Sequence, residues 1–363
     1  MLITLDATPL LGRRTGIGRY VDHLLTELPA AVGRRGLDAQ VRVTTWTARG
    51  ARLVDLPAGV HQVGRRISAR LLRECWRRTQ FPPIEALVGP TDVFHGTNFV
   101  SPPTRRAREV VTIHDLTYAL HADTVSPASL QYRELVPRAL ARGALVVTPT
   151  EVVADAVRTY YSLPAERVVA VPHGVEDAWF DATAPEPAWL RSNGLPDDYV
   201  VFVGSLDPRK NLPRLLEAHA RLRADSPGTP DLVLAGPAGR EASLQGRPGV
   251  HLTGWLEDDD LRRLVAGSRA LVLPSTDEGF GLPVLEALAA GRPVVVSDIP
   301  VLHEVAGPHA FAAAPDDSDA LADALRRATE APDDAPAREH RQAWAREFTW
   351  ARCADRTLET YLA

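Results

Sequence analysis

The sequence predicts an α/β protein built from two doubly wound domains, and three observations lead to that prediction. Short apolar runs alternate with amphipathic stretches along almost the whole chain. The runs are apolar throughout, which is typical of parallel strands that helices cover on both faces. The chain has 363 residues, enough for two domains that each bury a sizeable core. A repeated strand–helix order of this kind forms an open parallel sheet between helical layers.

Apolar runs predict strands in both halves of the chain. Those in the first half are Leu2–Leu5, Val41–Thr45, Val110–Ile113, Leu145–Thr148 and Val168–Val171. Those in the second half are Tyr199–Val203, Leu232–Ala235, Ala270–Leu273 and Pro293–Ser297. Amphipathic segments such as Asn211–Ala224 and Asp258–Ala266 are predicted helices. The acidic start of the second suits the positive end of a helix dipole and is not a convincing metal site.

A stretch rich in Pro, Ala and Asp, residues 181–198, has no strand pattern and predicts a domain boundary. We therefore expect a Rossmann-like N-terminal domain over residues 1–185 and a Rossmann-like C-terminal domain over residues 195–345. Residues 346–363 are expected to form a terminal helix that can pack back on the first domain.

Composition narrows the class of protein. The net charge of −5 implies no general affinity for nucleic acid. No apolar run approaches the roughly 18 residues of a spanning helix, and the N-terminus lacks the pattern of a signal peptide. The two cysteines lie far apart, as is typical of free thiols in a reducing cytoplasm, and no Cys or His cluster has zinc-ligand spacing. We expect a cytoplasmic protein without a metal site.

One cation is unusual in kind. The chain has 41 Lys and Arg residues, and only Lys210 is a lysine. A lysine kept against this bias indicates a position that needs a compact ammonium instead of a planar guanidinium. Chance is the alternative explanation, and the neighbours of Lys210 argue against it.

Lys210 lies in the segment "VGSLDPRKNLPRLLEAH", residues 203–219. A predicted strand runs into Gly204, Arg209 and Lys210 follow, and Asn211 is expected to cap the next helix. Two adjacent cations at the carboxyl end of a strand suit a diphosphate leaving group, whose charge grows as its bond to the sugar breaks. A surface basic pair is the alternative.

The segment "PSTDEGFGLPVLEALAAG", residues 274–291, predicts a phosphate site. A strand ends, a loop with Gly279 and Gly281 follows, and a helix opens at Pro283 and stops at Gly291. A glycine-bearing loop that leads into a helix N-terminus at the edge of a parallel sheet presents free N–H groups to an anion.

Two carboxylates flank this turn, Glu278 in the loop and Glu286 about one turn into the helix. A carboxylate beside a phosphate site suits the hydroxyls of a sugar, because an ionised carboxylate accepts several hydrogen bonds. One of the two can serve the ribose of a nucleotide and the other the transferred sugar. Two solvated glutamates beside a glycine turn are the alternative.

Together these segments resemble the retaining family-four glycosyltransferases (group 1 glycosyltransferases), and the resemblance covers most of the chain. It rests on "GSLDPRKN" at 204–211, Gly236, "GWL" at 254–256, the two glutamates with seven residues between them, and "GRPVVVSDIP" at 291–300. The resemblance implies the GT-B fold, in which two Rossmann-like doubly wound domains face each other across a cleft.

The resemblance also implies roles for single residues. Arg209 and Lys210 would hold the donor pyrophosphate, Glu286 the ribose and Glu278 the donor sugar. The backbone at Gly281 would contact phosphate. The whole donor site implied by the resemblance comprises Gly16, Gly18, Gly204, Arg209, Lys210, Trp255, Leu256, Glu278, Gly279, Phe280, Gly281, Leu282 and Glu286, with the base near Trp255 and Leu256.

In the first half, "TGIGRY" at 15–20 resembles the family's glycine-rich loop, and "HGTNF" at 95–99 and "TIHDLTY" at 112–118 resemble its acceptor side. His114 corresponds to a family histidine near the reacting carbon, where we expect it to position substrate. A scaffold histidine, or a base paired with Asp115, are the alternatives. "PHGV" at 172–175 has His173 where the family has Asn, so no role is assigned to His173.

The activity that the resemblance implies is a retaining hexosyl transfer in polysaccharide biosynthesis. The donor would be a nucleotide-diphosphate sugar, with GDP-mannose as the first guess. The acceptor would be a glycan, a lipid-linked glycan or a glycolipid. No cofactor is expected, and the donor is expected to bind without a metal ion.

Residues 65–78, "RRISARLLRECWRR", read as a basic amphipathic helix. Such a helix can lie on an anionic membrane, which would place the enzyme at the inner face of the membrane. A solvated helix packed on the first domain is the alternative.

Three other functions are weighed against transfer. The glycine spacing at 12, 16 and 18 resembles a short-chain dehydrogenase, but that class needs a Tyr four residues before a Lys, and Leu206 stands there. A nucleotide-sugar epimerase of the same fold would share the phosphate site without needing an acceptor. A non-catalytic nucleotide-sugar-binding partner would not need all four residues Arg209, Lys210, Glu278 and Glu286.

Overall fold

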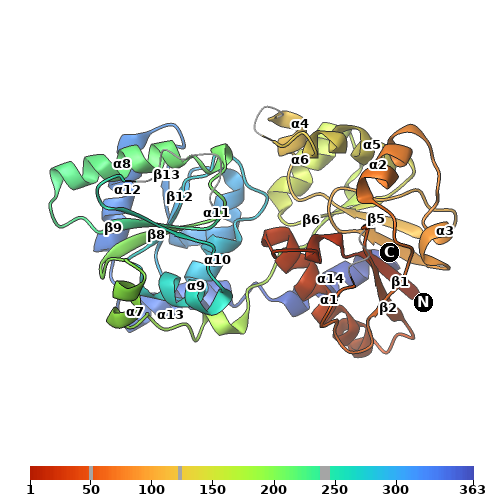
Figure 1. The fold of residues 1–363 in the computed structure, drawn as a ribbon, viewed down its shortest axis with the longest axis horizontal. Helices are drawn as coiled ribbons and strands as arrows, with labels where there is room; N and C mark the ends of the chain where they lie inside the picture. Colours follow the sequence, from red (N-terminus) through yellow and green to blue (C-terminus); the bar gives the residue numbers. More distant parts are fainter. Residues whose placement is uncertain (49–51, 122–124, 238–245) are drawn as a thin grey trace. The chain divides into compact units, whose positions relative to one another are not determined.

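The computed structural model describes residues 1–48, 52–121, 125–237 and 246–363, which form two compact units (Figure 1). Unit 1 comprises residues 1–174 and 349–363, and unit 2 comprises residues 175–348. The chain leaves unit 1 at residue 174, ahead of the expected boundary at 185. The reason is that Val175, Trp179 and Leu190 already belong to the core of unit 2.

Unit 1 holds a seven-stranded parallel sheet in the order β3-β2-β1-β4-β5-β6-β7. Its strands are β1 (Leu2–Asp6), β2 (Gln40–Thr44), β3 (His61–Gln62), β4 (Val93–Gly96), β5 (Arg108–Thr112), β6 (Leu145–Thr148) and β7 (Val168–Ala170). Its helices are α1 (Gly16–Arg34), α2 (Ala69–Arg78), α3 (Glu85–Val88), α4 (Thr117–Leu120), α5 (Tyr132–Ala141), α6 (Glu151–Tyr161) and α14 (Trp350–Leu362).

Unit 2 holds a six-stranded parallel sheet in the order β10-β9-β8-β11-β12-β13. Its strands are β8 (Tyr199–Val203), β9 (Asp231–Ala235), β10 (Val250–Gly254), β11 (Leu271–Leu273), β12 (Val294–Ser297) and β13 (Ala310–Ala313). Its helices are α7 (Pro187–Ser192), α8 (Leu212–Asp225), α9 (Asp258–Gly267), α10 (Leu282–Ala289), α11 (Pro300–Ala306), α12 (Ser318–Glu330) and α13 (Ala335–Ala345). In Figure 1, α8 lies above this sheet and α9 and α13 below it.

All nine strands predicted from apolar runs are present, each within a residue or two of its expected ends. The strands β3, β4, β10 and β13 were not predicted. Three of them lie at sheet edges, where burial on both faces is not needed and the apolar signal is weak. The fourth, β4, is central, but its sequence "VFHG" contains a buried histidine and a glycine that obscure the pattern.

The terminal helix α14 belongs to unit 1, where it packs along α1. Arg34 of α1 donates to Asp355 at 2.8 Å, and the rings of His23 and Trp350 stack with centroids 4.6 Å apart. Backbone contact is close at the same end, because a Cβ on Gly174 would lie 2.2 Å from the backbone nitrogen of Trp350. The last residues of the sequence are therefore part of the first unit.

No helix of the described residues is long and apolar enough to cross a membrane. Both cysteines are free thiols, with Cys353 buried and Cys75 half-buried.

Candidate active site

The candidate site in unit 2 lies where the order of the strands reverses. The chain runs from β8 outward to β9 and β10, then returns to add β11 on the other side of β8. The loops that leave the carboxyl ends of β8 and β11 therefore lead to opposite sides, and open α/β sheets bind ligands at such a point. These two loops carry Arg209, Lys210 and Glu278.

Glycines allow the backbone after β8 to take its path. Gly204 has φ +155°, and a Cβ there would lie 3.2 Å from the ring of Phe202 and 3.5 Å from Cε of Lys210. Gly236, after β9, has φ +147°, and a Cβ there would lie 1.9 Å from the carbonyl oxygen of Gly204. Both positions favour glycine for the conformation and for the space. The close approach of the two loops fixes the backbone that leads to Lys210.

Asn211 has a different role from the one expected. It is the residue before α8, but its side chain makes no capping hydrogen bond. Its backbone is left-handed, with φ +56°, and its Nδ2 donates to the carbonyl oxygen of Pro315 at 2.6 Å. The expectation of a side-chain cap was wrong, because a left-handed N-cap points its amide away from the first turn. Asn211 instead ties the β8–α8 loop to the segment before α12.

Four side chains meet in the loops that follow β8 and β11. The ammonium of Lys210 donates to Oε1 of Glu278 at 2.5 Å, and Arg209 donates to Oε2 of the same carboxylate at 3.3 Å. The hydroxyl of Ser275 donates to Oε1 at 2.7 Å. Lys210 and Glu278 are both buried, with 7% and 6% of their surfaces exposed. In this group two cations share one carboxylate, and Lys210 and Glu278 are largely shielded from water.

The charges of this cluster stabilise the ionised forms of Glu278 and Lys210 against the effect of burial. Burial alone would raise the pKa of Glu278, but Lys210 and then Arg209 outweigh burial and lower that pKa to about 2. Burial lowers the pKa of Lys210, and the attraction of Glu278 opposes that effect. Glu278 is therefore ionised at neutral pH and holds the ammonium group in place.

The loop after β11 completes the cluster and leads into a helix N-terminus. Thr276 donates its backbone N–H to the carbonyl oxygen of Arg209 at 2.9 Å, and Arg209 donates to the carbonyl oxygen of Asp277 at 3.2 Å. Gly281 precedes α10 with φ +94°, a left-handed conformation that favours glycine. The loop that carries Glu278 therefore leads directly into the first turn of α10, and the dipole of a helix favours an anion at that end.

The remaining residues of the predicted donor site lie on the same sheet edge. Glu286 is buried on α10, and Gly279 and Phe280 lie in the loop before it. Trp255 and Leu256 follow the edge strand β10 and are half-buried. The structure thus brings Arg209, Lys210 and Glu278 into direct contact, and it positions the others, Gly204 included, at the same edge of the sheet.

Unit 1 carries the other predicted residues, also after the carboxyl ends of strands. Gly16 begins α1, and Gly18 lies in its first turn. A Cβ on Gly18 would lie 3.1 Å from the carbonyl oxygen of Pro9, so this glycine lets α1 pack closely against the preceding turn. Close packing therefore explains why a glycine stands at position 18, which the motif alone does not reveal.

His114 follows β5 and is buried. Its Nε2 lies 2.9 Å from the carbonyl oxygen of Thr97, an acceptor only, so Nε2 carries the proton and Nδ1 the lone pair. Burial lowers the pKa of His114 to about 4, partly offset by the Thr97 carbonyl, so the ring is neutral at pH 7. Oδ1 of Asp115 accepts from the backbone N–H of Thr117. These contacts suit a fixed, neutral histidine.

Sequence reasoning missed the residues that orient the predicted ones. Ser275, Thr276 and Thr97 act through a hydroxyl or a backbone group, and such groups leave little trace in a single sequence. The one available signal was the position of Ser275 three residues before Glu278.

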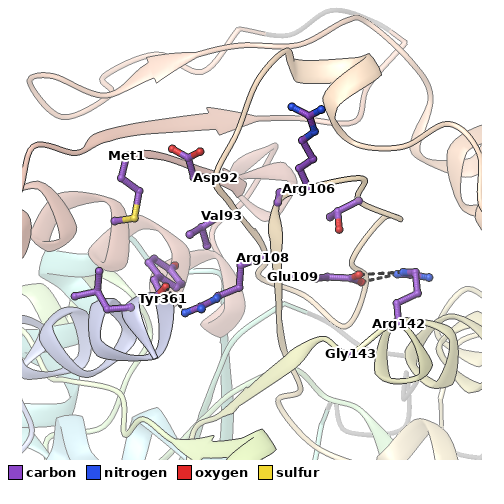
Figure 2. A pocket seen from close by; sticks show the side chains of 12 residues that line it. Met1, Asp92, Val93, Arg106, Arg108, Glu109, Arg142, Gly143 and Tyr361 are labelled. Atoms are coloured by element: carbon purple, nitrogen blue, oxygen red, sulfur yellow. Dashed lines mark hydrogen bonds and ion pairs between the residues drawn. The ribbon is translucent and has the colours of Figure 1, made fainter.

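A separate cavity of about 620 Å³ opens at the amino edge of the unit 1 sheet, the opposite edge from His114 (Figure 2). Arg142 and Glu109 face each other there as a bidentate ion pair, and Arg108 donates to the carbonyl oxygen of Tyr361 at 2.8 Å. Glu109 and Arg142 therefore neutralise each other at this cavity. Among the described residues, no three His, Cys, Asp or Glu side chains lie together as a metal site would require.

The basic segment at 65–78 forms α2 over its second part. Leu72 and Trp76 are buried in a cluster with Trp46 and Leu135, so one face of the helix packs on unit 1. Leu71 is 59% exposed, and Arg66 and Arg70 are exposed beside it. The interpretation as a helix packed on the first domain is confirmed for this face, and contact of the exposed face with a membrane stays a prediction.

Comparison with known proteins identifies the family. A model of Glycosyltransferase Family 4 matches residues 14–179, and a model of Glycosyl transferases group 1 matches residues 197–331. The chain is 29% identical over 283 residues to the O-antigen chain mannosyltransferase B of Escherichia coli, covering 74% of each protein. It is 27% identical over 232 residues to the O-antigen chain mannosyltransferase RfbU of Salmonella typhimurium, covering 62% of each.

A solved structure agrees in fold. The sucrose-phosphate synthase from Thermosynechococcus elongatus superposes with a TM-score of 0.74 at 19% identity, over 99% of this chain and 98% of that one. The two family models together span most of both units. The chain therefore belongs to the group 1, family-four glycosyltransferases and has their two-domain GT-B fold.

Proposed function

We propose that this glycosyltransferase moves a hexosyl group from a nucleotide-diphosphate sugar to a glycan, a lipid-linked glycan or a glycolipid. Mannose is the first candidate for the transferred sugar, and the transfer is proposed to retain the anomeric configuration. The observation that carries the proposal is the pair of Arg209 and Lys210, which share the carboxylate of Glu278 in the loop that leads into α10 at the strand reversal of unit 2. Two cations and a helix dipole converge where a diphosphate would bind.

The proposed reaction breaks the bond between the anomeric carbon and the diphosphate oxygen. The leaving group gains negative charge, which Lys210, Arg209 and the first turn of α10 stabilise. The acceptor hydroxyl forms the new bond on the same face of the sugar, and its proton passes to the departing phosphate oxygen. One carbon–oxygen bond breaks and one forms, and the acceptor proton leaves with the diphosphate, so the step balances without a further reactant.

Glu278 has two proposed tasks in this scheme. Without donor, its carboxylate neutralises the buried Lys210 and fixes the ammonium at 2.5 Å. When a diphosphate binds, the cations gain a second anionic partner, and the carboxylate oxygens become available to hydroxyls of the sugar. The ion pair thus prepares the cations for the leaving group without leaving a buried charge unpaired.

The other donor contacts follow the family assignment. Glu286 would bind the ribose, the backbone near Trp255 and Leu256 the base, and Gly16 and Gly18 would approach the donor from the loop of unit 1. His114 would position the acceptor or the sugar through its lone pair on Nδ1. Mannose, carried by GDP, is proposed because the relatives from Escherichia coli and Salmonella typhimurium are named mannosyltransferases.

The acceptor is proposed to lie at a membrane surface. Arg66, Arg70 and Leu71 form an exposed basic and apolar strip on α2 and the residues before it, while the opposite face of α2 is packed. Such a strip suits peripheral contact with anionic lipid at the cytoplasmic face, where a lipid-linked acceptor would be present.

A transfer assay tests the proposal. Purified protein is given GDP-, UDP-, ADP- or TDP-linked hexoses with a mannoside or lipid-linked acceptor, and proton NMR follows the donor and the new anomeric signal. We expect nucleotide release to need the acceptor and an α-linked donor to give an α-linked product. An inverted product would contradict the retaining mechanism, and a donor that changes configuration without transfer would indicate an epimerase.

A further inference from the structure

A chain of buried hydrogen bonds in unit 1 has no part in the proposed mechanism. The hydroxyls of Tyr20 and Thr112 lie 3.1 Å apart, and the Thr112 hydroxyl lies 2.7 Å from Nε2 of His95. Nδ1 of His95 lies 2.6 Å from the hydroxyl of Tyr361. All four residues are at most 2% exposed, and they join α1, β5, β4 and α14.

The imidazole of His95 lies in the middle of this chain and is neutral. Burial and then the neighbouring His114 lower the pKa of His95 to about 3. A neutral imidazole donates through one nitrogen and accepts through the other, so the His95 ring can bond Thr112 and Tyr361 at the same time in either tautomer. Tyr361 of the terminal helix thus holds the hydroxyl of Tyr20 through two intervening side chains.

Tyr20 in turn contacts the predicted site residue of unit 1. Its ring meets that of His114 edge-on, with centroids 5.4 Å apart and an angle of 81°. Its ring also stacks on His173 at 4.6 Å. His114 has one hydrogen bond that fixes it, to Thr97, and Phe99 contacts it at 5.5 Å. Of these neighbours of His114, Tyr20 is the one that belongs to the chain of buried hydrogen bonds.

We propose that Tyr20 is the positioning residue for His114, and that Thr112, His95 and Tyr361 anchor it from the terminal helix. The consequence is that the end of the sequence helps to set the acceptor-side histidine, although α14 does not carry a site residue. Arg108 holds the Tyr361 end of the hydrogen-bond chain in place, because it donates to the carbonyl oxygen of Tyr361 (Figure 2). The effect on catalysis rests on the proposed role of His114.

The first test compares kinetics of variants that remove single hydroxyls. Tyr20→Phe is expected to lower kcat about fivefold, the value of one buried hydrogen bond, with the KM for donor unchanged. Tyr361→Phe should lower kcat less, in the same direction. Thr112→Val, which breaks the chain in its middle, should add little to Tyr20→Phe in the double variant, because both remove the same bond.

Tyr199→Phe is the matched control, since the Tyr199 hydroxyl is also buried and donates to the carbonyl oxygen of Leu264 at 2.8 Å in unit 2. Tyr199→Phe should lose a comparable buried hydrogen bond and have the kcat of the wild type. Equal losses of kcat in Tyr20→Phe and Tyr199→Phe would mean a general structural effect and would overturn the proposal.

The second test does not depend on activity. Nitrogen-15 NMR of labelled histidine reports the tautomer and order of the His114 ring, assigned with His114→Ala. Tyr20→Phe and Thr112→Val should shift and broaden the His114 signals, and Tyr199→Phe should leave them unchanged. Unchanged signals in both variants would refute the positioning role. A different outcome separates the two proposals. If Tyr20→Phe and Thr112→Val shift the His114 signals but His114→Ala keeps full activity, the proposed role of His114 is refuted and the positioning by Tyr20 stands.

Discussion

Replacement of Glu278 by Gln tests the electrostatic account of the crevice through stability. The side chain keeps its size but loses the charge that pairs with Lys210 at 2.5 Å and Arg209 at 3.3 Å. The pKa of Glu278 is lowered from 4.5 to about 2, which corresponds to roughly 3 kcal/mol of stability when the carboxylate is ionised. We expect Glu278→Gln to lower the free energy of unfolding by about that amount at pH 7.

The sign of the pH dependence follows from the direction of the shift. Because the folded-state pKa is lowered, the stabilisation is complete above pH 4.5 and is lost as the pH falls towards 2. Urea unfolding of wild type and Glu278→Gln, followed by fluorescence between pH 7 and pH 3, should give a difference that shrinks below pH 4.5. A difference under about 1 kcal/mol at pH 7, or one that stays constant across this window, would refute the account.

Two further predictions concern the backbone of the site and the surface of α2. Gly236→Ala places a Cβ 1.9 Å from the carbonyl oxygen of Gly204 and should lower the unfolding free energy by more than about 3 kcal/mol, measured by urea unfolding. Gly228→Ala, which meets nothing within 4 Å, is its control, and equal stability of the two variants would contradict the close approach. Neutralising Arg66 and Arg70 together should reduce flotation of the protein with anionic phospholipid vesicles. Neutralising the exposed pair Arg326 and Arg327 of unit 2 is the control and should leave flotation unchanged. Equal flotation of both variants would contradict the proposed membrane contact.

The sequence predicted the elements of the site better than their contacts. Both site loops follow buried parallel strands, and the carboxyl ends of such strands share one edge, so Arg209, Lys210 and Glu278 were expected in one crevice. The direct bond between Lys210 and Glu278 was not expected, since the glutamate was assigned to sugar hydroxyls. That bond depends on β11 lying beside β8, and strand pairing between distant segments is not encoded in local patterns.

Contacts over long sequence distances were out of reach for the same reason. His95 and Tyr361 are separated by 266 positions, and neither has a neighbour in sequence that indicates the other. Asn211 shows the reverse case, in which a local rule predicted a helix cap and a tertiary bond to Pro315 prevailed. Local patterns therefore predicted strands and loops, while the side-chain network required the folded chain.

The central claim is that Lys210 and Arg209 bind the diphosphate of a nucleotide-sugar donor. Calorimetric titration of GDP, UDP, ADP and TDP into wild type, Lys210→Ala and the surface control Arg326→Ala tests it most directly. We expect one nucleotide to bind wild type and Arg326→Ala alike, and to bind Lys210→Ala at least about tenfold more weakly, since about 1.4 kcal/mol is less than one charged hydrogen bond contributes. Nucleotide binding that is indifferent to Lys210, or no binding by any of the four, would contradict the claim.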